Sequence, residues 1–312
     1  MRRRTALATL VAPSLAGAQP SAIRLVVPVA PGGSQDSVAR LLARFMAGPL
    51  GQGIIVENRT GAAGNIGYEI IARARSDGLT IGAGSDNLSI NKALFPLLGF
   101  DPVEEVSPIA QVSRVPQCLA VRASSPAADL AGFLKLARRG PVAVGTGGNG
   151  SLAHMLQQVV RELAGVSWTH VPYRGGAPAV NDLIAGQINA VMGNVGAVSE
   201  HIHSGLLRGI AVSSPGRIAA LPEVPSFTEQ GLPGAELLGW HGLVAPRASP
   251  PTIIYRLREA ALAAIRAPLV IERFAALGIE PDETGPAGLL ARMRADAERW
   301  GAMVRRGALR AE

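Results

Sequence analysis

The sequence is short of aromatic residues and of clustered positive charge, and each shortage excludes a class of protein. Aromatic residues make up 4% of the 312 residues, too few for the stacking platforms that bind single-stranded nucleic acid. The formal net charge is +7, but beyond the N-terminus the Lys and Arg residues are scattered rather than gathered in a run. We therefore expect no nucleic-acid partner, because a phosphate backbone needs a continuous basic surface.

Signatures of catalysis and of bound cofactors are absent or incomplete. The sequence contains no G-x-x-x-x-G-K-[ST] and no G-x-S-x-G motif. His201 and His203 stand two apart on a predicted helix, so they face different directions and cannot chelate one ion. No pair of carboxylates has a spacing that suggests acid–base work. We expect no metal, no cofactor and no enzymatic activity.

One motif keeps a nucleotide-dependent enzyme open as an alternative. Residues 145–150 match G-x-G-x-x-G between a predicted strand and a predicted helix. A dinucleotide fold then needs an acidic residue about 20 positions on, to bind the ribose. The chain has Pro172 and Tyr173 at that place and no acid nearby, which argues against this alternative.

The first 18 residues have the three parts of a signal peptide in order. Arg2–Arg4 are basic, residues 5–15 are apolar, and Ala16-Gly17-Ala18 are small. The apolar part is shorter than the roughly 20 residues of a spanning helix. We predict a signal peptide over residues 1–18, cleaved near Ala18, and export to the periplasm by the general or the twin-arginine route. The alternative is an Arg-rich first helix. The lone cysteine, Cys118, is far from this leader and excludes a lipid anchor at the cleavage site.

Beyond the leader, short β-branched strands alternate with helical patterns. The strand at residues 23–29 runs into Pro31-Gly32-Gly33-Ser34, after which apolar residues recur at helical spacing over residues 38–46. Similar units follow to about residue 212, and residues 108–121 are predicted to cross to a second unit as one or two strands. This alternation predicts an α/β fold with parallel strands and helices on both faces. Two helices, at residues 251–265 and 288–305, are predicted to end the chain.

Glycine-rich turns connect several of these strands to their helices. The main ones lie at residues 31–34, 61–65, 85–87 and 145–151. Glycine permits close backbone approach, and a helix N-terminus offers unpaired N–H groups and the positive end of the dipole. Any one of these turns is also expected without a ligand, simply as a short connection between a strand and a helix. Four of them at the carboxyl ends of strands predict two facing rims that bind an anion. His154, in the first turn after residue 151, either reaches this cleft or packs elsewhere.

Six motifs lie in order over nearly the whole mature chain, at residues 28–36, 56–67, 77–78, 147–151, 170–175 and 221–225. Together they resemble the Bug family, the extracytoplasmic receptors of tripartite tricarboxylate transporters. The resemblance implies a two-lobed periplasmic-binding-protein fold of the second type, with the ligand in the interdomain cleft. The chain would cross twice between a first lobe at residues 19–118 and 240–312 and a second lobe at residues 119–239.

The resemblance also implies a small ligand, usually a carboxylate, held by backbone amides and ordered water. Membrane transporter subunits would be the partners of a monomeric receptor. The alternative is a ligand sensor for a membrane signalling partner. Two positions depart from the family pattern: Gly193 stands where an Asp is frequent, and Gly196 where a Pro is frequent. The missing Asp makes an amino-acid ligand less expected. The predicted ligand-binding residues are Gly32, Gly33, Ser34, Asp36, Asn65, Ser85, Asp86, Gly147, Gly148, Asn149, Gly150, Ser151, His154, Tyr173 and Asn194.

Overall fold

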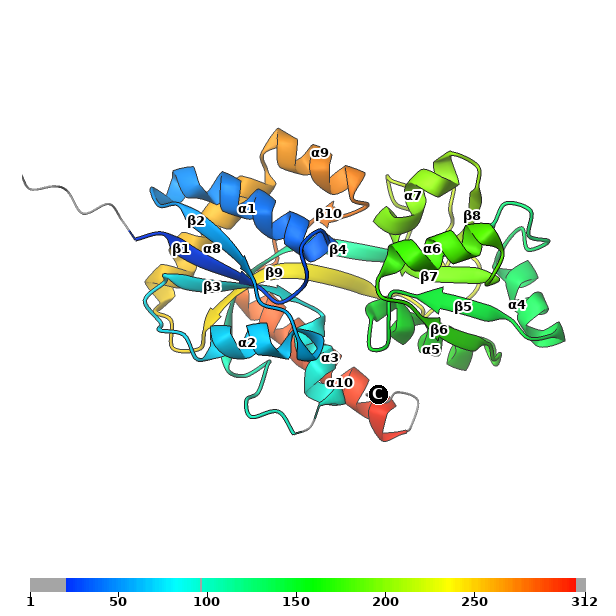
Figure 1. The fold of residues 1–312 in the computed structure, drawn as a ribbon, viewed down its shortest axis with the longest axis horizontal. Helices are drawn as coiled ribbons and strands as arrows, with labels where there is room; N and C mark the ends of the chain where they lie inside the picture. Colours follow the sequence, from blue (N-terminus) through cyan, green and yellow to red (C-terminus); the bar gives the residue numbers. More distant parts are fainter. Residues whose placement is uncertain (1–20, 96, 307–312) are drawn as a thin grey trace, which may run out of the picture.

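The computed structural model describes residues 21–95 and 97–306. The predicted signal peptide lies outside these residues. The molecule is elongated, with two groups of strands that are each covered by helices (Figure 1). Within the described ranges, no helix is both long and apolar enough to span a membrane.

The strands form one mixed sheet in the order β2-β1-β3-β9-β4-β7-β5-β6, with β8 and β10 also paired to β4. The pairs among β1, β2 and β3, and those of β5 with β6 and β7, are parallel as predicted. The linking strands β4 and β9 are antiparallel to their neighbours, which the sequence reading did not specify. The strands are β1 (Ile23–Val27), β2 (Ile54–Asn58), β3 (Thr80–Ser85), β4 (Val106–Arg122), β5 (Ala143–Thr146), β6 (Thr169–Pro172), β7 (Ala190–Asn194), β8 (Leu207–Val212), β9 (Leu238–Pro246) and β10 (Glu280–Pro281).

Helices follow most strands directly, as the strand–glycine–helix pattern predicts. They are α1 (Ser34–Leu50), the 3-10 turn η1 (Ala62–Gly64), α2 (Asn65–Ala72), α3 (Asn87–Leu94), α4 (Leu130–Arg139), α5 (Leu152–Ala164), α6 (Gly176–Ala185), α7 (Val195–His203), α8 (Pro251–Ile265), α9 (Pro268–Ala276) and α10 (Pro286–Arg305). The sequence predicted two helices at the end of the chain, but a third helix, α9, lies between them. Pro268 at the first position of α9 is a common helix start that would have revealed it.

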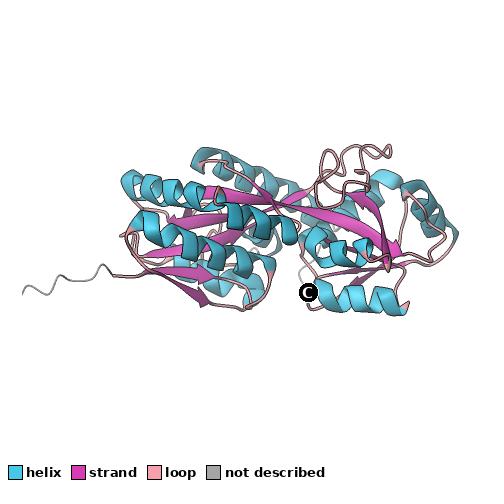
Figure 2. Cartoon of the chain, turned by 90° about the horizontal axis from the view of Figure 1, so that it is seen from above, coloured by secondary structure: helices cyan, strands magenta, loops and turns pink. Residues whose placement is uncertain are grey.

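Two long strands connect the two parts of the molecule. The 17-residue strand β4 pairs with β9 up to Pro116, opposite Leu238, and with β7 and β8 beyond that point. We call β1, β2, β3, β9 and the start of β4 the first strand group, and β5 to β8 with the end of β4 the second strand group. The connecting strands pass between the two groups without a break (Figure 2). The predicted lobe boundaries near Cys118 and Gly239 stay a prediction.

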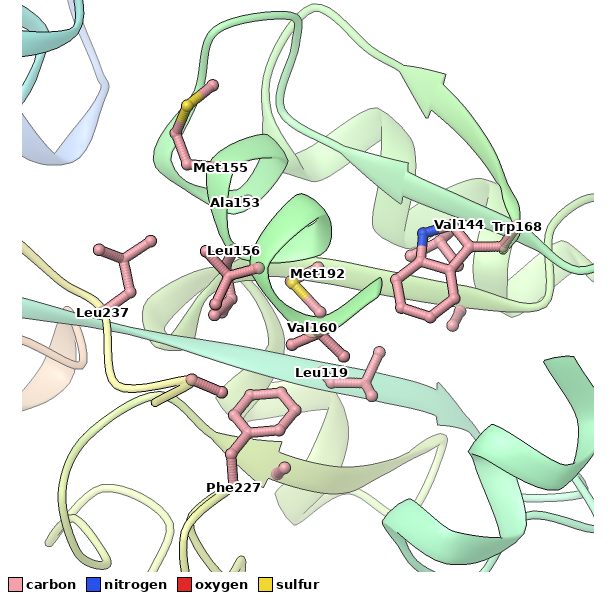
Figure 3. Close-up of a cluster of buried hydrophobic side chains, with 14 of the residues drawn as sticks. Leu119, Val144, Ala153, Met155, Leu156, Val160, Trp168, Met192, Phe227 and Leu237 are labelled. Atoms are coloured by element: carbon pink, nitrogen blue, oxygen red, sulfur yellow. The ribbon is translucent and has the colours of Figure 1, made fainter. Parts of the chain in front are cut away.

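Each strand group has its own apolar core. In the second group, Leu119, Val160 and Phe227 belong to one cluster of buried side chains (Figure 3). Burial of each large apolar side chain contributes about 1.5–3 kcal/mol. The same cluster continues into Leu94 of α3 and Trp300 of α10, which belong to helices of the first group. The groups are therefore joined by apolar packing on this side as well as by β4 and β9.

Candidate ligand-binding site

A cavity of about 560 Å³ lies where the two strand groups face each other. Its wall is formed largely by the N-terminal ends of five helices, α1 and α3 from the first group and α5, α6 and α7 from the second. The first N–H groups of a helix have no partner within the helix and carry the positive end of its dipole. Five such ends around one cavity make it a site for negative charge.

Most of these helix ends lack the side-chain cap that normally occupies the first N–H groups. Ser151 caps α5 by accepting a hydrogen bond from the His154 N–H at 3.3 Å. The residues before the other four helices, Gly33, Asp86, Gly175 and Asn194, make no such bond with their side chains. A side-chain cap is worth about 0.5–2 kcal/mol relative to alanine, but glycine, as at Gly33 and Gly175, gives up only roughly a few tenths of a kcal/mol. At α3 the Asn87 N–H donates to Ser85 Oγ at 3.4 Å, so the backbone donors available to a ligand lie mainly at α1, α6 and α7.

Two charged side chains line the cavity, Arg174 and Asp86. Arg174 is exposed, on the turn before α6, and adds positive charge to the wall. Asp86 is half-buried, and burial raises its pKa to about 6. Asp296 raises that pKa further, whereas Arg292 and the backbone N–H groups of Asp86 and Trp240 lower it. Asp86 therefore changes charge close to neutral pH.

We expect anion binding to strengthen as the pH falls from about 8 to about 5. Asp86 is mostly ionised above its pKa of about 6 and repels an anion there, and it is neutral below that value. A permanently ionised probe such as ethanedisulfonate isolates this effect, because its own charge stays constant. Calorimetric titration should show affinity rising severalfold in wild type. Asp86→Asn should bind at about pH 8 nearly as tightly as wild type does at about pH 5. An equal pH dependence in the variant would contradict this role.

The floor of the cavity contains a histidine that sequence reasoning did not select. His241, on β9, is 6% exposed and lies between two serine hydroxyls. Its Nε2 is 3.3 Å from Ser34 Oγ, and its Nδ1 is 3.0 Å from Ser113 Oγ. Burial lowers its pKa to about 4, so the ring is neutral at neutral pH. Its neighbour on β9, Trp240, is fully buried in the core.

The structure brings eight of the predicted site residues to this cavity. They are Gly32, Gly33, Ser34, Ser85, Asp86, Gly147, Ser151 and Asn194. The starts of α6 and α7 were missed apart from Asn194, as were Gln35, Gln117 and Arg174. The glycine pair Gly175-Gly176 before α6 was the sequence signal for one of these ends.

Asp36 does not line the cavity and instead supports the turn that does. Its carboxylate accepts hydrogen bonds from the Gly32 N–H at 3.0 Å, Arg40 Nε at 2.9 Å and Asn58 Nδ2 at 2.8 Å. Burial acts to raise the Asp36 pKa, but these bonds outweigh it and hold the pKa below its usual value. Gly32 has a φ of +93°, a conformation that glycine adopts readily. Asp36 thus fixes the bend that presents Gly33 and Ser34.

Asn149 and Gly150 line a second cavity of about 600 Å³ beside the first. Its opposite wall is the turn at residues 61–64. Asn65 lines neither cavity. It is buried at the start of α2, where its Oδ1 accepts a bond from Asn91 Nδ2 at 2.9 Å. The 61–65 turn therefore faces the neighbouring cavity rather than the first.

Gly148, His154 and Tyr173 line neither of these two cavities. The His154 ring turns back to its own loop, where Nδ1 accepts the Gly150 N–H at 3.2 Å, and it stacks on His170 with ring centroids 4.0 Å apart. Burial, followed by nearby His170, lowers the His154 pKa to about 4. Tyr173 donates its hydroxyl to Asp182 at 2.7 Å. These two side chains support the turns and do not face the cavity.

A known protein family matches most of this chain. The model of the TctC family, described as the tripartite tricarboxylate transporter family receptor, matches residues 38–309. The chain belongs to this family. It is 34% identical to Protein BugT of Bordetella pertussis over 305 residues, covering 96% of this chain and 94% of BugT. The predicted resemblance is confirmed.

Solved structures with similar sequences also match this chain over most of its length. The chain matches MatC of Rhodopseudomonas palustris with bound malate at a TM-score of 0.79 and 31% identity, covering 91% of this chain and 98% of MatC. It also matches an R. palustris protein with adipate at a TM-score of 0.81 and 30% identity, covering 91% and 96%. The periplasmic-binding-protein fold is confirmed. The chain is a periplasmic solute-binding protein and not an enzyme, which removes the nucleotide-dependent alternative.

Proposed function

We propose that this protein captures a small dicarboxylate in the cavity of about 560 Å³ and delivers it to membrane transporter subunits. The observation that carries the proposal is the convergence of five helix N-termini on one cavity, with no side-chain cap from the preceding residue at four of them. A carboxylate has two oxygens that accept hydrogen bonds from such N–H groups. Arg174 adds a positive side chain at the same wall.

The relatives support the ligand class. Malate and adipate, named for two similar structures, are both small dicarboxylates. The cavity volume lies within the range of about 300–1,000 Å³ that small-molecule sites occupy. A dicarboxylate can place one end at α1 and α3 and the other at α5, α6 and α7. Gly32 to Ser34 would hold the first end, and Gly147, Ser151 and Asn194 the second.

The proposed receptor works by closure of two lobes, residues 19–118 with 240–312 and residues 119–239, after cleavage of a signal peptide near Ala18. Each lobe supplies part of the donor set, so the ligand is fully bound only when the lobes are closed. A ligand shifts a conformational equilibrium only through its different affinity for the two states. The closed shape is then the form that transporter subunits recognise.

A thermal-shift screen tests this function. We expect succinate, malate and adipate to raise the melting temperature, because a ligand at 100 times its Kd adds about 2.7 kcal/mol to the free energy of unfolding. Succinamide is the matched control, since it has nearly the same size and no charge. We expect no shift with succinamide at equal concentration. Equal stabilisation by the diamide would contradict anion capture.

A further inference from the structure

Three side chains form a hydrogen-bonded series that ends at the cavity. Ser113, on β4, is fully buried; His241, on β9, is 6% exposed; and Ser34, at the start of α1, is half-buried and lines the cavity. Ser113 Oγ is 3.0 Å from His241 Nδ1, and His241 Nε2 is 3.3 Å from Ser34 Oγ. Cross-strand pairing sets the first contact, because Ser113 and His241 are register partners in β4 and β9.

Counting protons distinguishes the two ways in which this series can be arranged. A neutral imidazole has one N–H donor and one acceptor nitrogen, and each hydroxyl has one proton. If Nδ1 carries the proton, it donates to Ser113 and Nε2 accepts from Ser34. The Ser113 hydroxyl proton then needs another acceptor, and the described residues provide none. A buried donor without a partner is unfavourable.

The other arrangement satisfies every buried group. Ser113 donates its hydroxyl proton to Nδ1, and the Nε2–H donates to Ser34 Oγ. Ser34 has then accepted one bond, and its own proton is available to the cavity that it lines. The Ser34 hydroxyl is therefore the one donor left over in this series, and it lies beside the uncapped N–H groups of α1.

We infer that His241 is a positioning residue that turns the Ser34 hydroxyl into a donor for the ligand's carboxylate, with Ser113 fixing its tautomer. The inference rests on the proposed function, because it assigns a further contact in the same site. The ring itself does not touch the ligand in this role. The His241 Nε2–H donates to the Ser34 oxygen, so Ser34 offers its own proton to the ligand. The site therefore selects ligands that have a hydrogen-bond acceptor at the start of α1.

The first test needs no ligand. Long-range ¹H–¹⁵N NMR of the free protein at neutral pH, with His241→Phe to assign the ring, reports which nitrogen carries the proton. We expect a neutral ring protonated on Nε2. Ser113→Ala removes the donor to Nδ1, so the Nδ1–H tautomer should become populated in that variant. A wild-type ring protonated on Nδ1 would overturn the inference even if dicarboxylates bind.

The second test is a double-mutant cycle on succinate affinity. We expect Ser34→Ala to weaken binding about tenfold, since a hydrogen bond to a charged group is lost. His241→Phe should cost nearly the same, and the double variant little more than either single one. Ser113→Ala, which changes no cavity residue, should weaken binding severalfold in wild type and not in Ser34→Ala. The matched control is His203→Phe, at an exposed position on α7, with wild-type affinity expected.

The outcomes separate this inference from the proposed function. Independent, additive losses for Ser34→Ala and His241→Phe would overturn the positioning role while leaving anion capture intact. Wild-type protein that binds no dicarboxylate would overturn both. Melting temperatures of all variants, measured without ligand, show whether His241→Phe remains folded. If it does not, the Ser113→Ala and Ser34→Ala pair decides by the same criterion.

Discussion

Replacing Gly33 with valine is expected to weaken succinate binding by about tenfold or more without unfolding the protein. Gly33 precedes α1 with φ −74° and ψ 167°, a conformation that valine adopts readily. A Cβ added there meets no atom nearer than Ala30 O at 4.0 Å. The branched side chain obstructs approach to the first N–H groups of α1. Losing one hydrogen bond to a charged ligand costs about 1.5–3 kcal/mol, and 1.4 kcal/mol corresponds to tenfold.

The matched control for this substitution is Gly53→Val. Gly53 is exposed before β2, away from the cavity, and an added Cβ there also meets nothing within 4 Å. Calorimetric titration should show wild-type affinity for the control and a loss for Gly33→Val, at melting temperatures close to that of wild type. Unchanged affinity in Gly33→Val would mean that the start of α1 does not hold the ligand.

Replacing Gly196 with valine is expected to hold the lobes apart and reduce affinity by about tenfold to a hundredfold. Gly196 lies in the first turn of α7, and a Cβ added there would collide with the carbonyl oxygen of Leu277, just after α9. The contact is mutual, because a Cβ on Gly278 would lie 2.7 Å from Gly196 N. Gly196 and Leu277 both line the cavity, from opposite strand groups. Forcing side-chain atoms into such a contact costs about 1–3 kcal/mol.

Small-angle scattering distinguishes this effect from a simple loss of stability. The radius of gyration of the wild type should fall when succinate saturates it, and that of Gly196→Val should stay nearer the free value. Gly216→Val is the control, because Gly216 is exposed in the same proposed lobe and an added Cβ meets nothing within 4 Å. A wild-type radius that does not change at saturation would contradict closure. Wild-type affinity in Gly196→Val would contradict the role of this contact.

Local sequence patterns predicted the parts of this molecule that depend on local physics. A β-branched run, a glycine turn and a helical repeat specify one strand–helix unit each, and the N-termini of α1, α3 and α5 followed from them. The N-termini of α6 and α7 have the same kind of glycine-containing turn, at Gly175-Gly176 and Gly193-Asn194. A short glycine turn is equally expected without any ligand, so this signal alone does not identify a binding site.

Features that depend on strand register were not accessible from the sequence. Ser113 and His241 meet because β4 and β9 pair, although 128 positions separate them in the chain. The side-chain directions of His154 and Tyr173 were also not predictable. His154 lies in the first turn of α5 and Tyr173 in the loop before α6, but hydrogen bonds to Gly150 and Asp182 direct their polar atoms into the protein. The sequence thus predicted which turns lie beside the cavity more reliably than which side chains point into it.

A crystal structure of this protein with succinate tests the proposed capture most directly. We predict one carboxylate at the start of α1, with an oxygen about 2.7–3.1 Å from backbone N–H groups near Ser34, and the other at the starts of α6 and α7. Ser34 Oγ should donate to the first carboxylate. Succinate bound outside this cavity, or held in it without backbone N–H contacts from both strand groups, would contradict the proposed capture.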